Sequence, residues 1–250
     1  MAKQIVENKN CIDGINTLED NSIDLVITSP PYNVDLGKNK YKKDGYDLYF
    51  DNLNYFEYID WLALVFKTIH PKLKPGGRIA INIGDAKNGK IPTHVDLIAS
   101  LNKYYHYFST IIWDKGNTSN RAAWGSFLSP SCPSFPRSFE YICIFSKGTP
   151  KLSTKGESDL TKEEFIEWSN GLWKFPGETS KAINHPAPFP IQLPYRLIKM
   201  LSWKEATILD PFAGSGTTGV ACKQLNRNFI GFEISPSYCD MANKRIICQK

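Results

Sequence analysis

The sequence predicts an α/β protein in which one domain, residues 1–250, is built on an open and mostly parallel β-sheet. Short apolar runs alternate along the chain with longer stretches of helical periodicity. One of these runs ends in a glycine-rich turn that leads directly into a helix, at residues 210–219. A length of 250 residues suits one substantial α/β domain with an insertion and falls short of what two full-sized domains usually need.

The composition is that of an ordinary globular protein, with 42% hydrophobic and 22% charged residues. No apolar run approaches the roughly 18 residues of a membrane-spanning helix. Met1 to Glu7 lacks the core of a signal peptide, so a cytoplasmic protein without a membrane partner is expected. The six cysteines contain no C-x-x-C pair and the four histidines share no ligand spacing, so we expect neither disulfides nor a metal site. The net charge of +5 mildly favours a polyanionic partner.

The pattern of apolar residues places the individual elements. Strands are predicted where apolar and β-branched residues form short runs, and the helix near residues 55–70 has apolar residues at helical spacing. Pro30 and Pro31 lack the N–H groups that a strand ladder needs, so the chain leaves the sheet there. The predicted strands span 3–10, 22–27, 78–83, 108–113, 139–145, 206–209 and 228–233, and the predicted helices span 16–20, 55–70, 93–103, 162–168, 191–201 and 217–225.

The turn from Asp210 to Thr217 has the features of a ligand-binding turn between a strand and a helix. Gly214 and Gly216 allow the backbone to turn sharply and to approach a ligand with no Cβ between them. The first N–H groups of the following helix remain free to donate hydrogen bonds. Open α/β sheets hold nucleotides in this way, at the carboxyl end of a strand.

Charge decides which nucleotide-like ligand fits this turn. Gly214, Gly216 and Gly219 also match the G-x-G-x-x-G pattern of dinucleotide-binding enzymes, but Asp210 would repel a pyrophosphate at the helix N-terminus. S-adenosylmethionine has an adenosine half and a cationic methionine half, so it suits both the pocket and the carboxylate. Glu233 ends the next predicted strand, where it can accept both ribose hydroxyls.

A second site of chemistry is predicted at Ser29-Pro30-Pro31-Tyr32, at the end of another strand. The prolines stiffen this turn and leave carbonyl oxygens and the Ser29 hydroxyl as acceptors for N–H groups. An exocyclic amine of a nucleic-acid base presents such N–H groups, and Tyr32 offers a flat face on which a base can stack. Acceptors directed at the amine hydrogens would free the nitrogen lone pair for methylation, with no metal and no covalent enzyme intermediate required.

The two motifs together resemble those of the beta-class DNA amino-methyltransferases, in which Ser-Pro-Pro-Tyr precedes the cofactor motif. The similarity spans nearly the whole chain. It implies a Rossmann-like sheet of seven strands, one of them antiparallel, with the two motifs on adjacent central strands. It further implies double-stranded DNA as the substrate, S-adenosylmethionine as the cofactor and a target base that is flipped out of the duplex.

The resemblance also assigns roles to individual residues. Asp13 matches the acid near the cofactor adenine, and Pro188 lies in a proline-bearing stretch upstream of the glycine turn that touches the cofactor. The implied catalytic residues are Ser29, Pro30, Pro31 and Tyr32. The implied cofactor-binding residues are Asp13, Pro188, Asp210, Pro211, Phe212, Gly214, Ser215, Gly216, Thr217 and Glu233.

Three segments are candidates for DNA contact. Residues 34–54 interleave lysines with tyrosines, and the long loop directly follows the Ser-Pro-Pro-Tyr motif. Residues 116–138 are too polar for a core and too aromatic for a plain linker, and residues 148–184 occupy the family's target-recognition position. The predicted phosphate contacts are Lys38, Lys40, Lys42, Lys43, Arg121 and Arg137.

The first residue of the catalytic motif favours one base over another. Ser29 is a neutral hydroxyl, whereas relatives that act on adenine more often carry Asp or Asn there, so methylation of cytosine N4 is favoured and adenine N6 is the alternative. More remote alternatives are a protein amide methyltransferase, which has Asn before Pro-Pro-Tyr, and an inactive DNA-binding module. A cognate restriction endonuclease and a second copy of the chain are further candidate partners.

Overall fold

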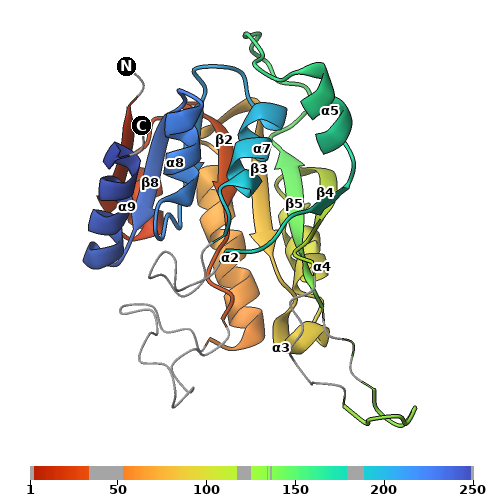
Figure 1. Cartoon of the computed structure of the whole chain (residues 1–250). Coiled ribbons are helices and arrows are strands. Elements are labelled where there is room, and N and C mark those ends of the chain that lie inside the picture. The colour runs from red at the N-terminus through yellow and green to blue at the C-terminus, as the bar shows by residue number, and fades with distance from the viewer. Residues whose placement is uncertain are drawn as a thin grey trace.

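The computed structural model describes residues 3–33, 53–116, 125–133, 135, 137–178 and 189–248. These residues form one twisted sheet of eight strands, in the order β1-β8-β7-β2-β3-β5-β4-β6 (Figure 1). β5 runs antiparallel to both of its neighbours, and the other pairings are parallel. The strands are β1 Gln4–Asn8, β2 Ile23–Thr28, β3 Leu73–Ile83, β4 His106–Asp114, β5 Phe139–Ser146, β6 Leu172–Lys174, β7 Thr207–Asp210 and β8 Asn228–Glu233.

The predicted α/β class and the single antiparallel strand are confirmed, whereas the predicted count of seven strands is one too low. The additional strand, β6, has three residues and pairs with β4 at the edge of the sheet. It escapes prediction because Leu172-Trp173-Lys174 is too short to show an alternating pattern. The adjacent position of β2 and β7 also agrees with the family resemblance.

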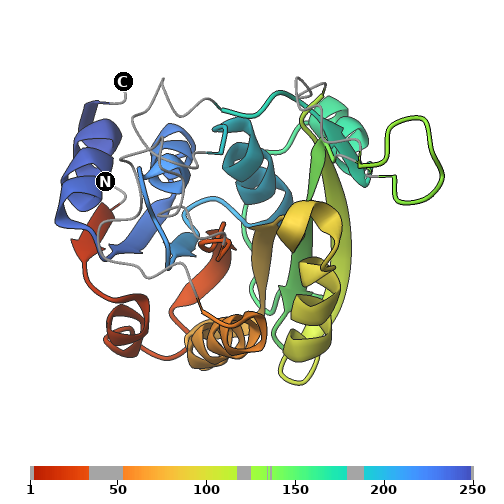
Figure 2. The same cartoon turned by 90° about the horizontal axis from the view of Figure 1, so that it is seen from below.

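Helices cover both faces of the sheet, as the view from below shows (Figure 2). One layer holds α1, α2 and α4, and the other holds α7, α8 and α9, with α5 beside α7. None of the described helices is both long and apolar enough to cross a lipid bilayer. The helices are α1 Cys11–Asn16, α2 Tyr55–Ile69, α3 Ala86–Gly89, α4 Thr93–Leu101, α5 Lys162–Trp168, α7 Gln192–Leu201, α8 Thr217–Gln224 and α9 Pro236–Cys248.

Capping side chains fix where the first helices begin. Asn54 and Glu57 form a reciprocal capping box at the start of α2. Asn10 accepts a hydrogen bond from the Ile12 N–H at 2.9 Å and starts α1. The predicted helix at 16–20 was therefore placed wrongly, because α1 ends at Asn16.

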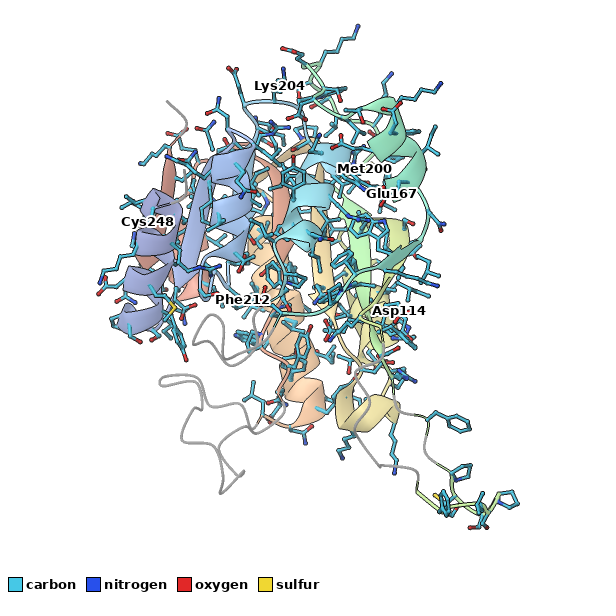
Figure 3. All side chains as sticks on the ribbon, viewed as in Figure 1. Asp114, Glu167, Met200, Lys204, Phe212 and Cys248 are labelled. Atoms are coloured by element: carbon cyan, nitrogen blue, oxygen red, sulfur yellow. The ribbon has the colours of Figure 1, made fainter. Side chains whose placement is uncertain are left out.

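The parallel strands β1, β2, β3, β4, β7 and β8 all end at the same edge of the sheet, which we call the carboxyl edge. β5 begins at this edge because it is antiparallel. In Figure 3, Asp114, the last residue of β4, and Phe212, just after β7, lie well below Lys204, which precedes β7 and lies at the top. Apolar side chains on the two faces of the sheet form two buried clusters that hold these strand ends in place.

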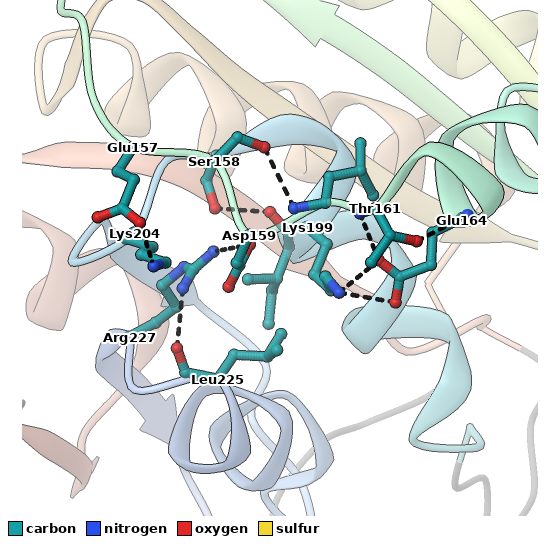
Figure 4. Close-up of polar contacts among 12 residues, drawn as sticks. Glu157, Ser158, Asp159, Thr161, Glu164, Lys199, Lys204, Leu225 and Arg227 are labelled. Carbon is teal, nitrogen blue, oxygen red and sulfur yellow. Dashed lines mark hydrogen bonds and ion pairs between the residues drawn. The ribbon is translucent and has the colours of Figure 1, made fainter.

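The segment before and within α5 is fastened to the opposite edge of the sheet by ion pairs (Figure 4). Glu157 pairs with Lys204 at 2.5 Å, and Asp159 pairs with Arg227 at 2.9 Å. The Glu164 carboxylate binds Lys199 on α7, whose side chain is only 7% exposed. This part of the candidate DNA-contacting segment 148–184 therefore lies away from the carboxyl edge and contributes to packing.

Candidate active site

Asp210 joins the two sequence motifs where β2 and β7 end side by side. The hydroxyl of Thr28, the last residue of β2, donates to Asp210 Oδ1 at 2.7 Å. The Thr218 hydroxyl, in the first turn of α8, donates to Oδ2 at 2.7 Å, and the Phe212 N–H donates to Oδ1 at 3.1 Å. Two threonine hydroxyls and one backbone amide thus hold the carboxylate at the junction of both motifs with α8.

Burial leaves two carboxyl groups of the site poorly solvated. Asp210 is fully buried, which raises its pKa to about 6 even though Thr28 and Thr218 stabilise its charged form. Burial also raises the pKa of Glu233. Neither carboxyl group forms an ion pair with any of the described residues. A cationic ligand would stabilise both charged forms.

The glycine turn wraps around the end of β7 and meets Glu233 on β8. Gly214 has a φ of +50° and donates its N–H to Glu233 Oε2 at 2.8 Å. The other oxygen of Glu233 accepts from the Ser235 N–H at 2.9 Å. Gly216 has a φ of +79°, and a Cβ atom there would approach Cβ of Ala242 to 2.7 Å, so only glycine fits.

These features fit S-adenosylmethionine. The glycine turn leaves backbone close to the ligand space, and α8 begins without a capping side chain, so its first N–H groups remain available. The two unpaired carboxyl groups suit a ligand with a sulfonium and an ammonium. Of the other predicted cofactor residues, Pro211, Ser215 and Thr217 are buried and Phe212 is half-buried against Trp61, with ring centroids 5.5 Å apart.

The Ser-Pro-Pro-Tyr turn leaves the carboxyl end of β2 in a fixed conformation. The Tyr58 hydroxyl of α2 donates to the Pro31 carbonyl at 2.7 Å, so this predicted acceptor already has a partner. Asn33 forms two hydrogen bonds with the backbone of Leu53, at 2.7 and 2.9 Å. The Pro31 carbonyl is thus used within the protein, whereas the Ser29 hydroxyl remains a candidate acceptor for a substrate.

A polar network that sequence patterns did not reveal surrounds Tyr32. The Tyr32 hydroxyl accepts from Ser29 Oγ at 3.1 Å and from Asn82 Nδ2 at 3.0 Å, and it donates to Glu140 Oε2 at 3.1 Å. Asn82 Nδ2 also donates to Glu140 Oε2 at 2.8 Å, and Lys115 forms an ion pair with Glu140 Oε1. Burial, and next the charge of Glu140, raise the pKa of Tyr32 well above its ordinary value, so its hydroxyl keeps its proton.

Asn82 and Glu140 were missed because each occurs in an apolar strand without a motif. Asn82 is 2% exposed, and its Oδ1 has no hydrogen-bond partner within the part of the chain that the structure describes. A buried acceptor without a partner is unfavourable by about 1 to 3 kcal/mol. The only available signal was a polar residue at a position where β3 is otherwise apolar.

Comparisons with known proteins agree with this geometry. The family profile described as DNA methylase matches residues 23–244. The chain is 42% identical over 192 residues to the type II methyltransferase M.MjaVI of Methanocaldococcus jannaschii, covering 72% of this chain and 95% of that protein. It is 32% identical over 287 residues to M.MjaI of the same organism, covering 98% and 93%. The chain belongs to the DNA methylase family.

Solved structures extend the agreement to the fold and the cofactor. TTHA0409 from Thermus thermophilus, in complex with S-adenosyl-L-methionine, has a TM-score of 0.75 at 28% identity, covering 98% of this chain and 94% of that chain. The cytosine-N4-specific PvuII DNA methyltransferase has the same fold, with a TM-score of 0.74 at 24% identity and coverage of 98% and 86%. This DNA methylase therefore uses S-adenosylmethionine and methylates either cytosine N4 or adenine N6 of DNA.

The remaining predicted site residues of this DNA methylase are placed unevenly. Asp13 is exposed on α1, which begins at the carboxyl edge. The Arg137 guanidinium pairs with Asp85 and donates to the Gly89 carbonyl at 3.0 Å, so its described partners are within the protein. The predicted residues Pro188, Lys38, Lys40, Lys42, Lys43 and Arg121 lie outside the described residues.

Proposed function

We propose that this DNA methylase flips a cytosine out of duplex DNA and transfers a methyl group from S-adenosylmethionine to its N4 amine. The observation that carries the proposal is the hydroxyl of Ser29, held beside Tyr32 at the carboxyl edge. Its proton is directed to the Tyr32 oxygen, and Asn82 Nδ2 donates to it at 3.4 Å, so one lone pair of the hydroxyl is left to accept a hydrogen of the amine. A neutral hydroxyl acceptor suits the smaller pyrimidine, and PvuII methyltransferase, which shares the fold, is cytosine-N4-specific.

The cofactor would lie along the glycine turn between the two carboxyl groups. In this proposal Glu233 accepts the ribose hydroxyls, Asp210 provides negative potential near the methionine half, and Phe212 lines the pocket. When bound, S-adenosylmethionine supplies a methyl group that its sulfonium has already activated. The protein positions the amine, directs acceptors to its hydrogens and keeps the turn rigid through the Tyr58 hydrogen bond.

DNA contacts are proposed from the charge and composition of two segments. The lysines of residues 34–54 and Arg121, which lie outside the described residues, would neutralise phosphates of the duplex. Residues 125–133 carry exposed Phe127 and Leu128, which suit contact with bases. A cognate restriction endonuclease is a further proposal, which rests on the type II methyltransferases among the relatives, and a second copy of the chain stays a candidate partner.

Analysis of modified nucleosides tests the assignment of the base. The protein is expressed in a host without other amino-methyltransferases, and the genomic DNA is digested and analysed by mass spectrometry. We expect N4-methylcytosine from wild type and none from Ser29→Ala. N6-methyladenine without N4-methylcytosine would overturn the cytosine assignment and leave the amino-methyltransferase family standing.

A further inference from the structure

Glu140 lies at the start of β5, at the carboxyl edge, where its carboxylate is directed at the catalytic motif. Its side chain is 13% exposed. Oε2 accepts from Tyr32 and from Asn82, and Oε1 is paired with Lys115. The described partners of this carboxylate are thus donors, and they come from different strand ends.

The carboxylate determines the direction of the hydrogen bonds that reach Ser29. A carboxylate can only accept, so the single Tyr32 proton must be donated to Glu140. The Tyr32 oxygen then accepts from Asn82 and from Ser29. The proton and both lone pairs of the Tyr32 hydroxyl are thereby used. Ser29 consequently faces a substrate amine as an acceptor, and an unbroken chain of hydrogen bonds connects that amine to Glu140.

On the basis of the proposed function, we propose that Glu140 is the final acceptor of the proton that the substrate amine loses, reached through Ser29 and Tyr32. Because Glu140 acts through these two residues, it is a positioning residue rather than a catalytic one. Asn82 Nδ2 donates to the Tyr32 hydroxyl at 3.0 Å and to Glu140 Oε2 at 2.8 Å, and so holds the two groups next to each other. Lys115, 24% exposed, connects Glu140 to the protein surface.

The proton transfers balance. The amine nitrogen forms a bond to the methyl carbon as the carbon–sulfur bond breaks, with the electron pair of that bond left on sulfur. The cationic nitrogen gives one proton to Ser29 Oγ, the Ser29 proton passes to the Tyr32 oxygen, and the Tyr32 proton passes to Glu140. Ser29 and Tyr32 end neutral, as they began, and Glu140 ends as a carboxylic acid that loses its proton to water.

Single-turnover methylation of a DNA duplex at saturating cofactor tests this chain of hydrogen bonds. Glu140→Gln retains an acceptor for Tyr32 but takes up no proton, so we expect methylation about 10²-fold slower than wild type.

A double-mutant cycle separates a relay from two independent structural effects. Tyr32→Phe should also slow methylation, and the double variant Tyr32→Phe with Glu140→Gln should be no slower than the slower single variant, because both break one chain. The affinities of all three variants for cofactor and for DNA, measured by calorimetry, should equal those of wild type. The inference would be overturned if the rate reduction of the double variant equals the product of the two single reductions. It would also be overturned if Glu140→Gln methylates at the wild-type rate.

Glu157→Gln is the matched control, because Glu157 pairs with Lys204 at the opposite edge of the sheet. The methylation rate of this variant should equal that of wild type. The outcomes also separate this inference from the proposed function on which it rests. If wild type methylates no DNA, the proposed function fails; if it does so and Glu140→Gln is equally fast, only the relay fails.

Discussion

The charge of Asp210 is buried at the junction of the two motifs, and this has a consequence for stability. The pKa of Asp210 is about 6 in the folded protein, against an ordinary value of 3.8. Between these values the folded protein binds more protons than the unfolded chain, so the contribution of this group to stability falls as the pH rises. Above about pH 6 the buried charge of Asp210 lowers the free energy of unfolding by its full amount, on the order of 3 kcal/mol.

Asp210→Asn should therefore gain stability relative to wild type as the pH rises. We expect the difference in free energy of unfolding to shift in favour of the variant by up to about 3 kcal/mol between about pH 4 and about pH 7. Urea unfolding of cofactor-free proteins at several pH values measures it. A difference that does not depend on pH would contradict a buried, poorly solvated carboxylate.

Glu233 makes a separate prediction about cofactor affinity. Glu233→Ala removes the acceptor for Gly214 N–H and the proposed acceptor for the ribose, so S-adenosylmethionine should bind more weakly by about 1 to 3 kcal/mol. Isothermal titration calorimetry on folded protein measures the affinity. Glu157→Ala, on the opposite edge of the sheet, should bind like wild type. Equal affinities of the two variants would remove Glu233 from the cofactor site.

Single residues were predictable from the sequence only where they belong to a local motif. Asp210 and Glu233 stand at strand ends beside glycines, and the structure brings them to one turn through Gly214. Asn82 and Glu140 reach Tyr32 only through strand pairing, from positions 50 and 108 residues away along the chain. No local pattern carries such long-range contacts, so neither residue was predicted.

At the scale of elements, the position of α8 depends on a glycine that does not belong to the ligand surface. A Cβ atom on Gly219 would lie 2.4 Å from Cδ1 of Ile246 on α9 and 2.7 Å from the Phe229 ring on β8. The third glycine of the motif is thus required for close packing of α8 between α9 and the sheet. Its backbone does not have a positive φ, so sterics alone explain the choice.

Gly219→Ala should lower the free energy of unfolding by about 1 to 3 kcal/mol, the range for overpacking a dense core. Gly171→Ala is the control, because the nearest atom to its added Cβ is 4.0 Å away. Chemical denaturation of both variants measures the effect. If Gly171→Ala loses as much stability as Gly219→Ala, the close packing of α8 is not the cause.

Most elements followed from periodicity, and the failures have physical causes. The 55–70 helix was predicted within one residue because its apolar stripe is long. α1 was misplaced because its six residues are too few to show a stripe, and an Asn10 cap decides its start. β3 begins at Leu73, five residues before the predicted strand, because Pro75-Gly76-Gly77 is typical of a turn, whereas Gly76 and Gly77 share backbone hydrogen bonds with Lys147 at 2.9 Å.

At the scale of the whole molecule, a methyl-transfer site arises from segments that are far apart in the chain. Thr28 and Asp210 are 182 residues apart and share a hydrogen bond because β2 and β7 are neighbours. The order of the strands places both motifs at one edge, which is where open α/β sheets bind ligands. The ion pairs around α5 lie at the other edge, away from the proposed site.

The salt dependence of DNA affinity tests whether the lysines that follow the Ser-Pro-Pro-Tyr motif contact phosphates. Replacing Lys38, Lys40, Lys42 and Lys43 by Gln should weaken DNA binding and reduce the log–log salt slope by up to about 4. Cofactor affinity should not change, because the substitutions leave the glycine turn intact. Fluorescence anisotropy across salt concentrations gives the slope. An unaltered slope would show that these lysines do not contact phosphates.

Methyl transfer by Ser29→Ala with S-adenosylmethionine bound tests most directly whether the two motifs form one site with separate tasks. The measurement is single-turnover transfer of labelled methyl groups to duplex DNA, at a cofactor concentration that saturates both proteins. Because the proposed partner of Ser29 is the amine and not the cofactor, we predict the same cofactor affinity as wild type and transfer at least about 10²-fold slower. Transfer at the wild-type rate would contradict the account.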